Sequence, residues 1–439
     1  MYWFILLFPL LIYPMGPEGP DTYYAKLKVL YLDGFVLIYW LYIIFKRKYW
    51  TLEKEKFYLT MEFLILIFIS LVGLSTTFSV DKMNSFYGRV FRKEGFVTYF
   101  SYCSLLIFSY RFLNINKLKK LLHGIGIVSI FVSFYGILQH YGVDPLRSDG
   151  KSIFGSRSSA FFDNPNFFAS YLVLVILLTI TLLLITNYKK VLLFYFIIIG
   201  MSFTALIFSS TRSGWVGLCI GILFLSMVVI LKRRYLWKKW VTLLLLLSLI
   251  AGVINTFENG VYTNRLNAAV SDSYHVVANK STGMEGSSRL YIWKKSFPLL
   301  KNYFLIGSGP DTFGEIFPAK PDELIKYFGT PNLTVDKAHN EYLQIAVTLG
   351  IPALFVYLFL LVAVLRNAYK ALKIASGPDQ ILLYGLISTI LGYLAQAYFN
   401  ISTVPVAPLF WSILGITLAK SSVYLKSKTS YTEKFNQSA

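Results

Sequence analysis

The chain has 439 residues, a net charge of +20 and a hydrophobic content of 56%, with a mean hydropathy of +0.57. These values exclude a soluble globular protein and indicate a polytopic membrane protein. The positive charge does not indicate nucleic-acid binding, because Lys and Arg in a membrane protein mostly mark cytoplasmic turns. The two cysteines, Cys103 and Cys219, lie inside apolar segments, which argues against a disulfide framework and a zinc site.

Repeated apolar segments separated by charged turns predict an all-α bundle of about 12 transmembrane helices, with one large extracytoplasmic loop that bears short helices. The segments are centred near Leu7, Val36, Ile67, Leu105, Ile130, Val175, Ile198, Gly221, Leu247, Val356, Ile390 and Ser412. The first segment is short, and the last is interrupted by two prolines. The expected divisions are helices 1–9 in residues 1–255, the loop in 256–338, helices 10–12 in 339–421 and a basic cytoplasmic tail in 422–439.

The distribution of basic residues predicts the orientation. With both termini in the cytoplasm, the basic turns, such as Lys46-Arg47-Lys48 and Lys232-Arg233-Arg234, lie inside. The first apolar segment lacks the basic n-region of a cleavable signal peptide. The long loop then lies outside the cytoplasmic (inner or plasma) membrane. No ATP or nucleotide sugar is present there, so a transfer reaction needs a donor that is already activated and has been flipped across.

Arginines in the outer turns violate this charge rule and are candidates for anion binding. Arg212 lies in a very short turn between two apolar segments, where a guanidinium group needs an anionic partner. The partner is a phosphate or pyrophosphate, or else a lipid headgroup that the side chain reaches by snorkelling. Arg89, Arg147 and Arg157 lie in other outer turns and have the same two interpretations.

Two predicted helix starts add further polar groups. Asn164-Pro165-Asn166 is typical of a turn with proline near the first helical position, and its exposed amides suit an anion, although an ordinary capped helix has the same pattern. Residues 286–293 predict the start of an amphipathic helix on the bilayer surface. Arg289 lies in its first turn, where the helix dipole disfavours a cation. We therefore expect an anionic partner for Arg289, or a structural salt bridge.

His339 is the candidate base, with a structural histidine as the alternative. It stands where the loop ends, and we expect it one helical turn before Tyr342 on the same face. An imidazole of ordinary pKa suits proton removal from a sugar hydroxyl near neutral pH. A D-x-D motif, a P-loop, an H-E-x-x-H motif and an evident carboxylate pair are absent from the sequence. We therefore expect no metal and no cofactor, because a pyrophosphate leaving group needs only cations and a base for the acceptor.

The order and spacing of several short motifs resemble the O-antigen ligase and polymerase (Wzy/WaaL-type) family of bacterial envelope glycan enzymes. The motifs are Phe162-Asp163-Asn164-Pro165-Asn166, Thr211-Arg212-Ser213-Gly214, Ser288-Arg289, Gly307-Ser308-Gly309 and His339-Asn340-Glu341-Tyr342-Leu343. They cover the central and C-terminal parts of the chain, and the predicted spans and loop position extend the resemblance to the whole.

The resemblance implies a GT-C-like membrane glycosyltransferase that moves or polymerises glycan linked to undecaprenyl pyrophosphate, without metal, at the outer face of the cytoplasmic membrane. It implies that Arg212 and Arg289 bind the pyrophosphate or steer the acceptor, and that His339 activates the acceptor hydroxyl for inverting attack. The other expected binding residues are Arg157, Arg147, Arg89, Asn164, Asn166 and Tyr342. Asp163 departs from the family pattern, and we expect it to weaken phosphate binding or to pair with Arg157.

The resemblance leaves the acceptor open. A ligase of lipopolysaccharide synthesis uses lipid A-core, a polymerase uses another lipid-linked repeat, and a protein-directed relative often carries an outer C-terminal domain, unlike the short basic tail of this chain. The alternative class is a transporter or flippase for an anionic lipid-linked glycan, but no internal repeat is evident. The expected partners are the glycan donor, the acceptor and the lipid bilayer. We expect the loop to fold back as a lid over Arg212 and Arg157.

Overall fold

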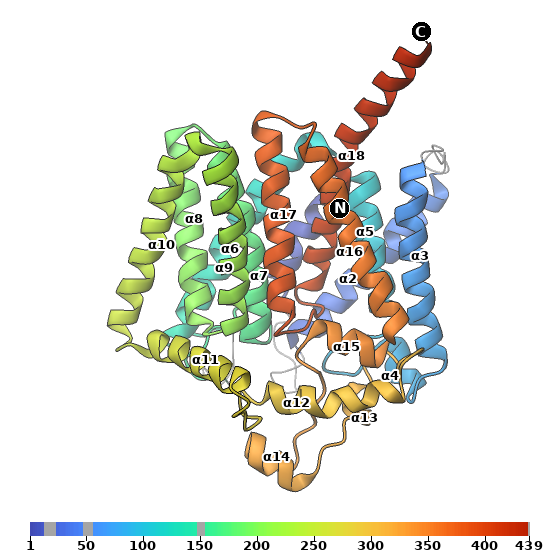
Figure 1. Cartoon of the computed structure of the whole chain (residues 1–439), viewed down its shortest axis with the longest axis vertical. Coiled ribbons are helices and arrows are strands. Elements are labelled where there is room, and N and C mark those ends of the chain that lie inside the picture. The colour runs from blue at the N-terminus through green and yellow to red at the C-terminus, as the bar shows by residue number, and fades with distance from the viewer. Residues whose placement is uncertain (13–22, 47–55, 147–153, 438–439) are drawn as a thin grey trace.

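The computed structural model describes residues 1–12, 23–46, 56–146 and 154–437, and this part of the chain is helical without a β-strand (Figure 1). The helices are α1 (Tyr2–Leu7), α2 (Tyr23–Phe45), α3 (Lys56–Thr77), α4 (Lys82–Tyr87), α5 (Phe96–Phe112), α6 (Leu118–His140), α7 (Pro165–Ile185), α8 (Lys189–Phe208), α9 (Arg212–Lys232), α10 (Trp237–Phe257), α11 (Val261–Val277), α12 (Arg289–Ser296), α13 (Phe313–Ile316), α14 (Pro321–Phe328), α15 (Glu341–Thr348), α16 (Ile351–Leu372), α17 (Gly377–Ala397) and α18 (Ala407–Gln437).

In the described residues, 9 helices are long and apolar enough to cross a membrane. They are α2, α6, α7, α8, α9, α10, α16, α17 and α18. The polytopic all-α class is therefore confirmed, but the predicted count of 12 is not. The segment around Leu7 forms only a six-residue helix and a short 3-10 turn, and six residues rise about 9 Å, far less than a bilayer core. The segment around Ile67 forms α3, whose apolar part is Met61–Thr77, and the segment around Leu105 forms the 17-residue α5.

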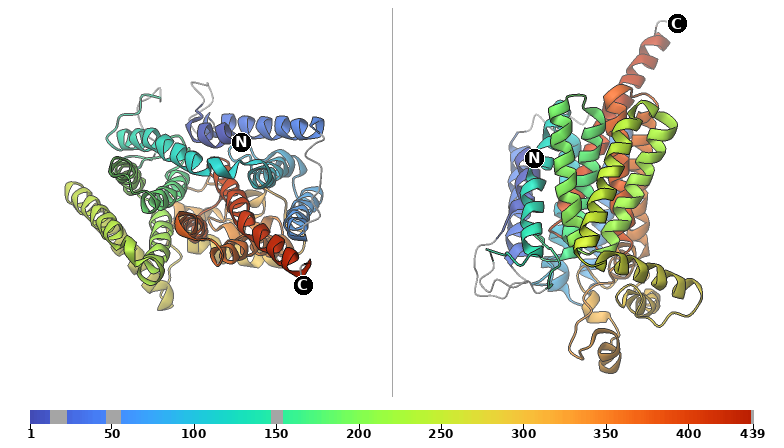
Figure 2. Two further views of the ribbon diagram at one scale, coloured as in Figure 1. Left: turned by 90° about the horizontal axis from the view of Figure 1, so that it is seen from above. Right: turned by 90° about the vertical axis from the view of Figure 1, so that its left-hand side faces the viewer.

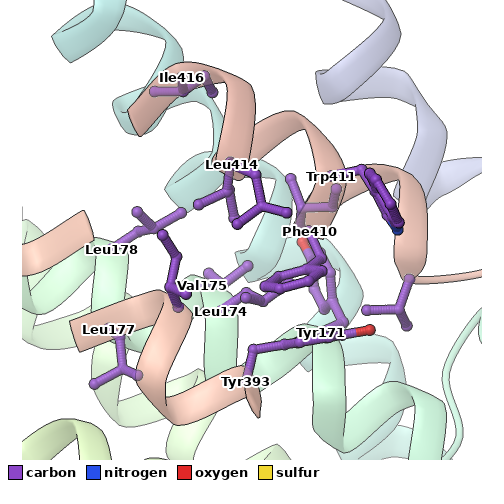
Figure 3. Close-up of a cluster of buried hydrophobic side chains, with 14 of the residues drawn as sticks. Tyr171, Leu174, Val175, Leu177, Leu178, Tyr393, Phe410, Trp411, Leu414 and Ile416 are labelled. Atoms are coloured by element: carbon purple, nitrogen blue, oxygen red, sulfur yellow. The ribbon is translucent and has the colours of Figure 1, made fainter. Parts of the chain in front are cut away.

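The centre of the bundle is α7, which is buried along almost its whole length. A helix that is apolar on every side is expected in such an interior position. Tyr171 and Leu174 of α7 lie beside Tyr393 of α17 and Phe410 of α18 (Figure 3). The rings of Tyr393 and Phe410 stack with their centroids 3.9 Å apart.

Small and polar residues bring α7, α9 and α17 close together. A Cβ on Gly217 of α9 would lie 2.5 Å from the carbonyl oxygen of Gly392 on α17, so this approach requires glycine, as in other membrane helix pairs. Ser170 of α7 donates a hydrogen bond to Gln396 of α17 (2.8 Å), and Asn400 donates one to Ser170 (3.1 Å). These contacts fix the beginning of α7 against the end of α17.

The helices between α10 and α16 gather at one end of the bundle, together with α4, and α18 projects from the opposite end (Figures 1 and 2). The predicted tail from 422 onward begins as a continuation of α18, which runs to Gln437. The predicted loop is thus a group of short helices at one end of the bundle. We call this end of the bundle the loop end.

The loop end has a hydrophobic cluster of its own. Tyr291 and Ile292 of α12, Phe313 of α13 and Leu324 of α14 pack with Leu343 of α15. The loop is therefore more than a lid, because apolar residues from four short helices stabilise it.

A separate helix, α15, intervenes before the first membrane helix that follows the loop. Gly350 stands between α15 and α16 with φ +92°, a conformation that only glycine adopts readily. A Cβ there would also lie 2.5 Å from the carbonyl oxygen of Leu305.

Candidate functional site

Arg212 and Arg289 each occupy the first position of a helix at the loop end. Arg212 begins α9 and follows Ser210 at φ +52°, while Arg289 begins α12 and follows Ser287 and Ser288 at φ +60° and +64°. The expected place of Arg289 in the first turn of a loop helix is therefore confirmed. Left-handed conformations of non-glycine residues cost free energy and concentrate at functional sites. The two guanidinium groups also lie where the helix dipoles already carry partial positive charge.

The turn between α8 and α9 collects two more arginines. Arg157 donates hydrogen bonds to the Ser209 carbonyl (3.1 Å) and to the Thr211 hydroxyl (3.3 Å). Arg265 of α11 donates to the Ser210 carbonyl (2.9 Å). The pairing of Arg157 with Asp163, one of the two outcomes expected from the sequence, is therefore not found among the described residues.

Asp272 of α11 links the loop to this turn. Its Oδ2 accepts hydrogen bonds from Arg212 Nη1 (2.6 Å) and from the backbone amide of Gly286 (3.1 Å). One carboxylate thus connects the start of α9, α11 and the segment before α12. The expectation that the loop folds back over the arginines of separate turns agrees with these contacts.

Positive charge exceeds negative charge in this cluster of Arg157, Arg212, Arg265 and Arg289, which we call the arginine cluster. Within the described residues, Arg212 has a carboxylate partner, but Arg289 has neither an ion pair nor a side-chain hydrogen bond. Burial and the nearby charges of Arg157 and Arg212 lower the pKa of Arg289 to about 10. Burial and Arg265 lower the pKa of Arg157 to about 10. Cations held together in this way are a site for an anion.

His339 precedes α15 and is not part of it. The expectation that it shares a helical face with Tyr342 is wrong: Asn340 caps α15, Glu341 is its first residue, and His339 has φ +49°. The Nδ1 atom of His339 is buried, and no described residue forms a hydrogen bond with it. A structural histidine is usually oriented by hydrogen bonds, so this ring lacks the contacts expected of the structural alternative.

Three contacts fix the segment that carries His339. Trp293 Nε1 of α12 donates to the carbonyl of Ala338 (3.0 Å), which ties the helix of Arg289 to the residue before the imidazole. Arg92 pairs with Asp336 (2.6 Å). Lys337 pairs with Asp311 (2.7 Å) in an almost fully buried position, where removal of one partner costs about 3–5 kcal/mol.

The surroundings of His339 favour its neutral form. Burial and Arg289 lower the pKa of His339 to about 4; Asp336 opposes this shift, and Arg92 and Lys337 add smaller effects that lower the pKa further. Nearby cations disfavour a second positive charge. The imidazole is therefore neutral at physiological pH in the unliganded protein and is able to accept a proton.

Two predicted binding residues lie away from the arginine cluster. Arg89 and Asn164 line a separate polar cavity of about 720 Å³, together with Arg92 and Asp336. Asn164 is also the cap of α7, with Pro165 as the first helical residue, so the predicted helix start is confirmed. The pKa of His339 is affected by the charge of Arg289 in the cluster and by those of Arg92 and Asp336 in the cavity wall.

The remaining predicted residues have structural contacts or lie outside the described part. Tyr342 donates a hydrogen bond to the Leu394 carbonyl of α17 (2.9 Å). The carbonyl of Asn166 accepts one from Asn400 (3.2 Å). Arg147 lies outside the described residues.

An apolar cavity of about 500 Å³ lies beside the arginine cluster. Trp215 and Leu218 of α9 line it one and two turns after Arg212, and Leu266 of α11 lines it next to Arg265. It lies between α8, α9, α10 and α11, and its lining reaches Ile222, about three turns along α9 from Arg212. The arginine cluster and the apolar cavity therefore lie next to each other.

Sequence reasoning did not assign roles to Asp272, Trp293 and Thr403. Asp272 and Trp293 lie in the loop, where no local pattern marks which side chains meet. Thr403 lies in the turn between α17 and α18 and lines the polar cavity. In the described residues, no three His, Cys, Asp or Glu side chains form a group that could hold a metal ion.

The helical bundle and its cation-rich loop end define a polytopic membrane protein with an anion site at one end. Residues 196–358, a little more than a third of the chain, match the family model described as O-antigen ligase. This segment includes Arg212, Arg289 and His339. The match supports an O-antigen ligase or polymerase type, and therefore a membrane enzyme of the glycosyl-transfer type. No curated protein sequence matches the chain.

Proposed function

We propose that the protein is a metal-independent, inverting glycosyltransferase that transfers or polymerises glycan linked to undecaprenyl pyrophosphate. The observation that carries the proposal is Arg289, which has no anionic partner among the described residues. It lies close to Arg157 and Arg212 and to the imidazole of His339, whose Nδ1 has no hydrogen-bond partner in the same part of the chain. Such a cluster suits a pyrophosphate leaving group, whose charge grows as the glycosidic bond breaks.

The roles follow from this arrangement. Arg289, Arg212 and Arg157 bind the pyrophosphate of the donor. His339 removes the proton from the acceptor hydroxyl, which attacks the anomeric carbon from the side opposite the pyrophosphate and inverts it. The C–O bond to the pyrophosphate breaks, and the lipid pyrophosphate leaves with the electron pair.

The apolar cavity supports a lipid-linked donor. It begins one turn from Arg212 and is lined mainly by apolar side chains of four helices, so the first isoprene units of the lipid fit there while the pyrophosphate contacts the arginines. A transfer from a flipped lipid donor requires the loop end to face outward from the cytoplasmic membrane, with both termini inside. The basic turns at the other end agree with this orientation.

Reconstitution of the purified protein in liposomes tests the proposal. The vesicles contain undecaprenyl-pyrophosphate glycan and either lipid A-core or further lipid-linked glycan as the acceptor, with a chelator present. We expect a product in one of these mixtures: a ladder of lengthening lipid-linked chains identifies a polymerase, and a single shift of lipid A-core identifies a ligase. Movement of the donor across the bilayer without a new glycosidic bond would instead identify a flippase.

The pH dependence provides a further prediction. Because His339 acts in its deprotonated form, activity is present above its pKa and is lost as the pH falls through it. In the free protein this pKa is about 4. A bound pyrophosphate offsets the positive charge of Arg289, so the pKa of His339 rises in the complex. The acidic limb of kcat/KM, which reports the free enzyme, is expected at lower pH than that of kcat, which reports the complex. Coincident limbs, or the reverse order, would contradict this prediction.

A further inference from the structure

The polar cavity beside His339 differs from the arginine cluster in its charge balance. Arg92 in its wall pairs with Asp336 at 2.6 Å, and Arg89 lies 3.8 Å from Glu315. Each of these two arginines has a carboxylate nearby, and Asp163 adds a further carboxylate to the lining. The wall therefore carries no excess of positive charge, unlike the arginine cluster, and does not favour an anion.

The lining has the chemistry of sugar recognition. Sugars present hydroxyl groups at their edges and apolar C–H groups on their ring faces. The polar residues of the wall include Asn84, Arg89, Arg92, Asn164, Asp336 and Thr403. Phe91 supplies a largely exposed ring at the same cavity. The volume of about 720 Å³ lies within the ordinary range for binding sites of about 300–1,000 Å³.

Thr403 also lines the cavity, in the turn between α17 and α18. Backbone hydrogen bonds hold its turn in place: the amides of Ser402 and Val404 donate to the carboxylates of Glu341 (2.5 Å) and Glu94 (2.6 Å).

We propose that this cavity binds the acceptor, as an uncharged oligosaccharide whose terminal hydroxyl reaches His339. The inference rests on the proposed function for the direction of transfer. The donor pyrophosphate occupies the arginine cluster, and an inverting attack requires the acceptor on the opposite side of the anomeric carbon. Asp336 of the cavity wall stands three residues before His339 in the chain, and the charges of Arg92 and Asp336 act on the imidazole. Arg157, Arg212 and Arg289 do not line the cavity.

Two substitutions in the cavity wall of the full-length protein test this inference. Val90 is largely exposed and lines the cavity, so Val90→Trp narrows it without disturbing the core. Phe91→Ala removes the aromatic surface. Each change is expected to raise the KM for the acceptor about tenfold while the KM for the lipid donor stays the same. Met83→Trp, at an exposed position of α4 away from the cavity, is the matched control. An unchanged acceptor KM in both cavity variants would overturn the proposal.

A binding measurement separates this inference from the proposed function, because it needs no turnover. The probe is a set of uncharged oligosaccharides released from the envelope polysaccharide of the producing cell, with oligogalacturonates as acidic comparators. Calorimetry on His339→Asn protein is expected to detect the uncharged sugars, with weaker binding in Val90→Trp and no displacement by inorganic pyrophosphate. Preference for the acidic sugars, or displacement by pyrophosphate, would overturn the inference. Full transfer by the His339→Asn protein would instead contradict the proposed base and leave the binding result standing.

Discussion

Replacement of His339 by alanine is expected to lower glycan transfer by about 10²–10⁴-fold, the usual contribution of a general base. The imidazole is affected by the charge of Arg289 in the arginine cluster and by those of Arg92 and Asp336 in the cavity wall, and its pKa of about 4 keeps it neutral in the free protein. The defect should lie in kcat, because the acceptor still binds and only the proton transfer is lost. The measurement is the rate of product formation by reconstituted protein at saturating donor and acceptor.

Two controls distinguish a chemical role of His339 from a structural one. His339→Asn keeps a residue that tolerates the observed φ of +49° but removes the base, so it should be folded and inactive. His275→Ala, at an exposed position of α11 in the same loop, should retain full activity. Substantial transfer by His339→Asn would show that another group takes the proton.

Replacement of Arg289 by alanine is expected to reduce kcat/KM for the lipid donor by about 10²–10³-fold, the effect of removing one group that stabilises developing negative charge. Arg289 has no carboxylate partner in the described residues, so its full charge is available to the pyrophosphate. Arg289→Lys keeps the charge but loses the planar guanidinium that binds phosphate through two hydrogen bonds. Its activity should lie between those of the alanine variant and the unmodified protein.

Thermal unfolding with inorganic pyrophosphate checks anion binding without turnover. A ligand that binds only the folded protein raises its Tm, so pyrophosphate should stabilise the unmodified protein and have much less effect on Arg289→Ala. Arg366→Ala, an exposed arginine of α16, is the matched control and should respond like the unmodified protein. Equal stabilisation of all three proteins would contradict a role of Arg289 in anion binding.

Local signals predicted some features of the site well and others poorly. Asn164 and Pro165 begin α7 as expected, and Arg289 is the first residue of α12, because caps and helix starts depend on neighbouring residues. The left-handed conformation of His339 was not predictable, because the segment that carries it is held by distant contacts: Ala338 accepts a hydrogen bond from Trp293 of α12, and Asp336 pairs with Arg92 between α4 and α5.

Hydropathy and charge by themselves determined that this protein is an all-α membrane bundle with a long polar loop, since burial in lipid requires long apolar helices whatever their partners. They also showed that arginines lie in the predicted outer turns, where the distribution of basic residues in membrane proteins does not favour them. Only the tertiary structure decided how these arginines divide. Arg212 meets Asp272, Arg92 meets Asp336, Arg89 lies toward Glu315, and Arg289 is left without a carboxylate. The partners are far apart in sequence, so whether a cation is neutralised or available to a ligand depends on the packing of helices that no local pattern encodes.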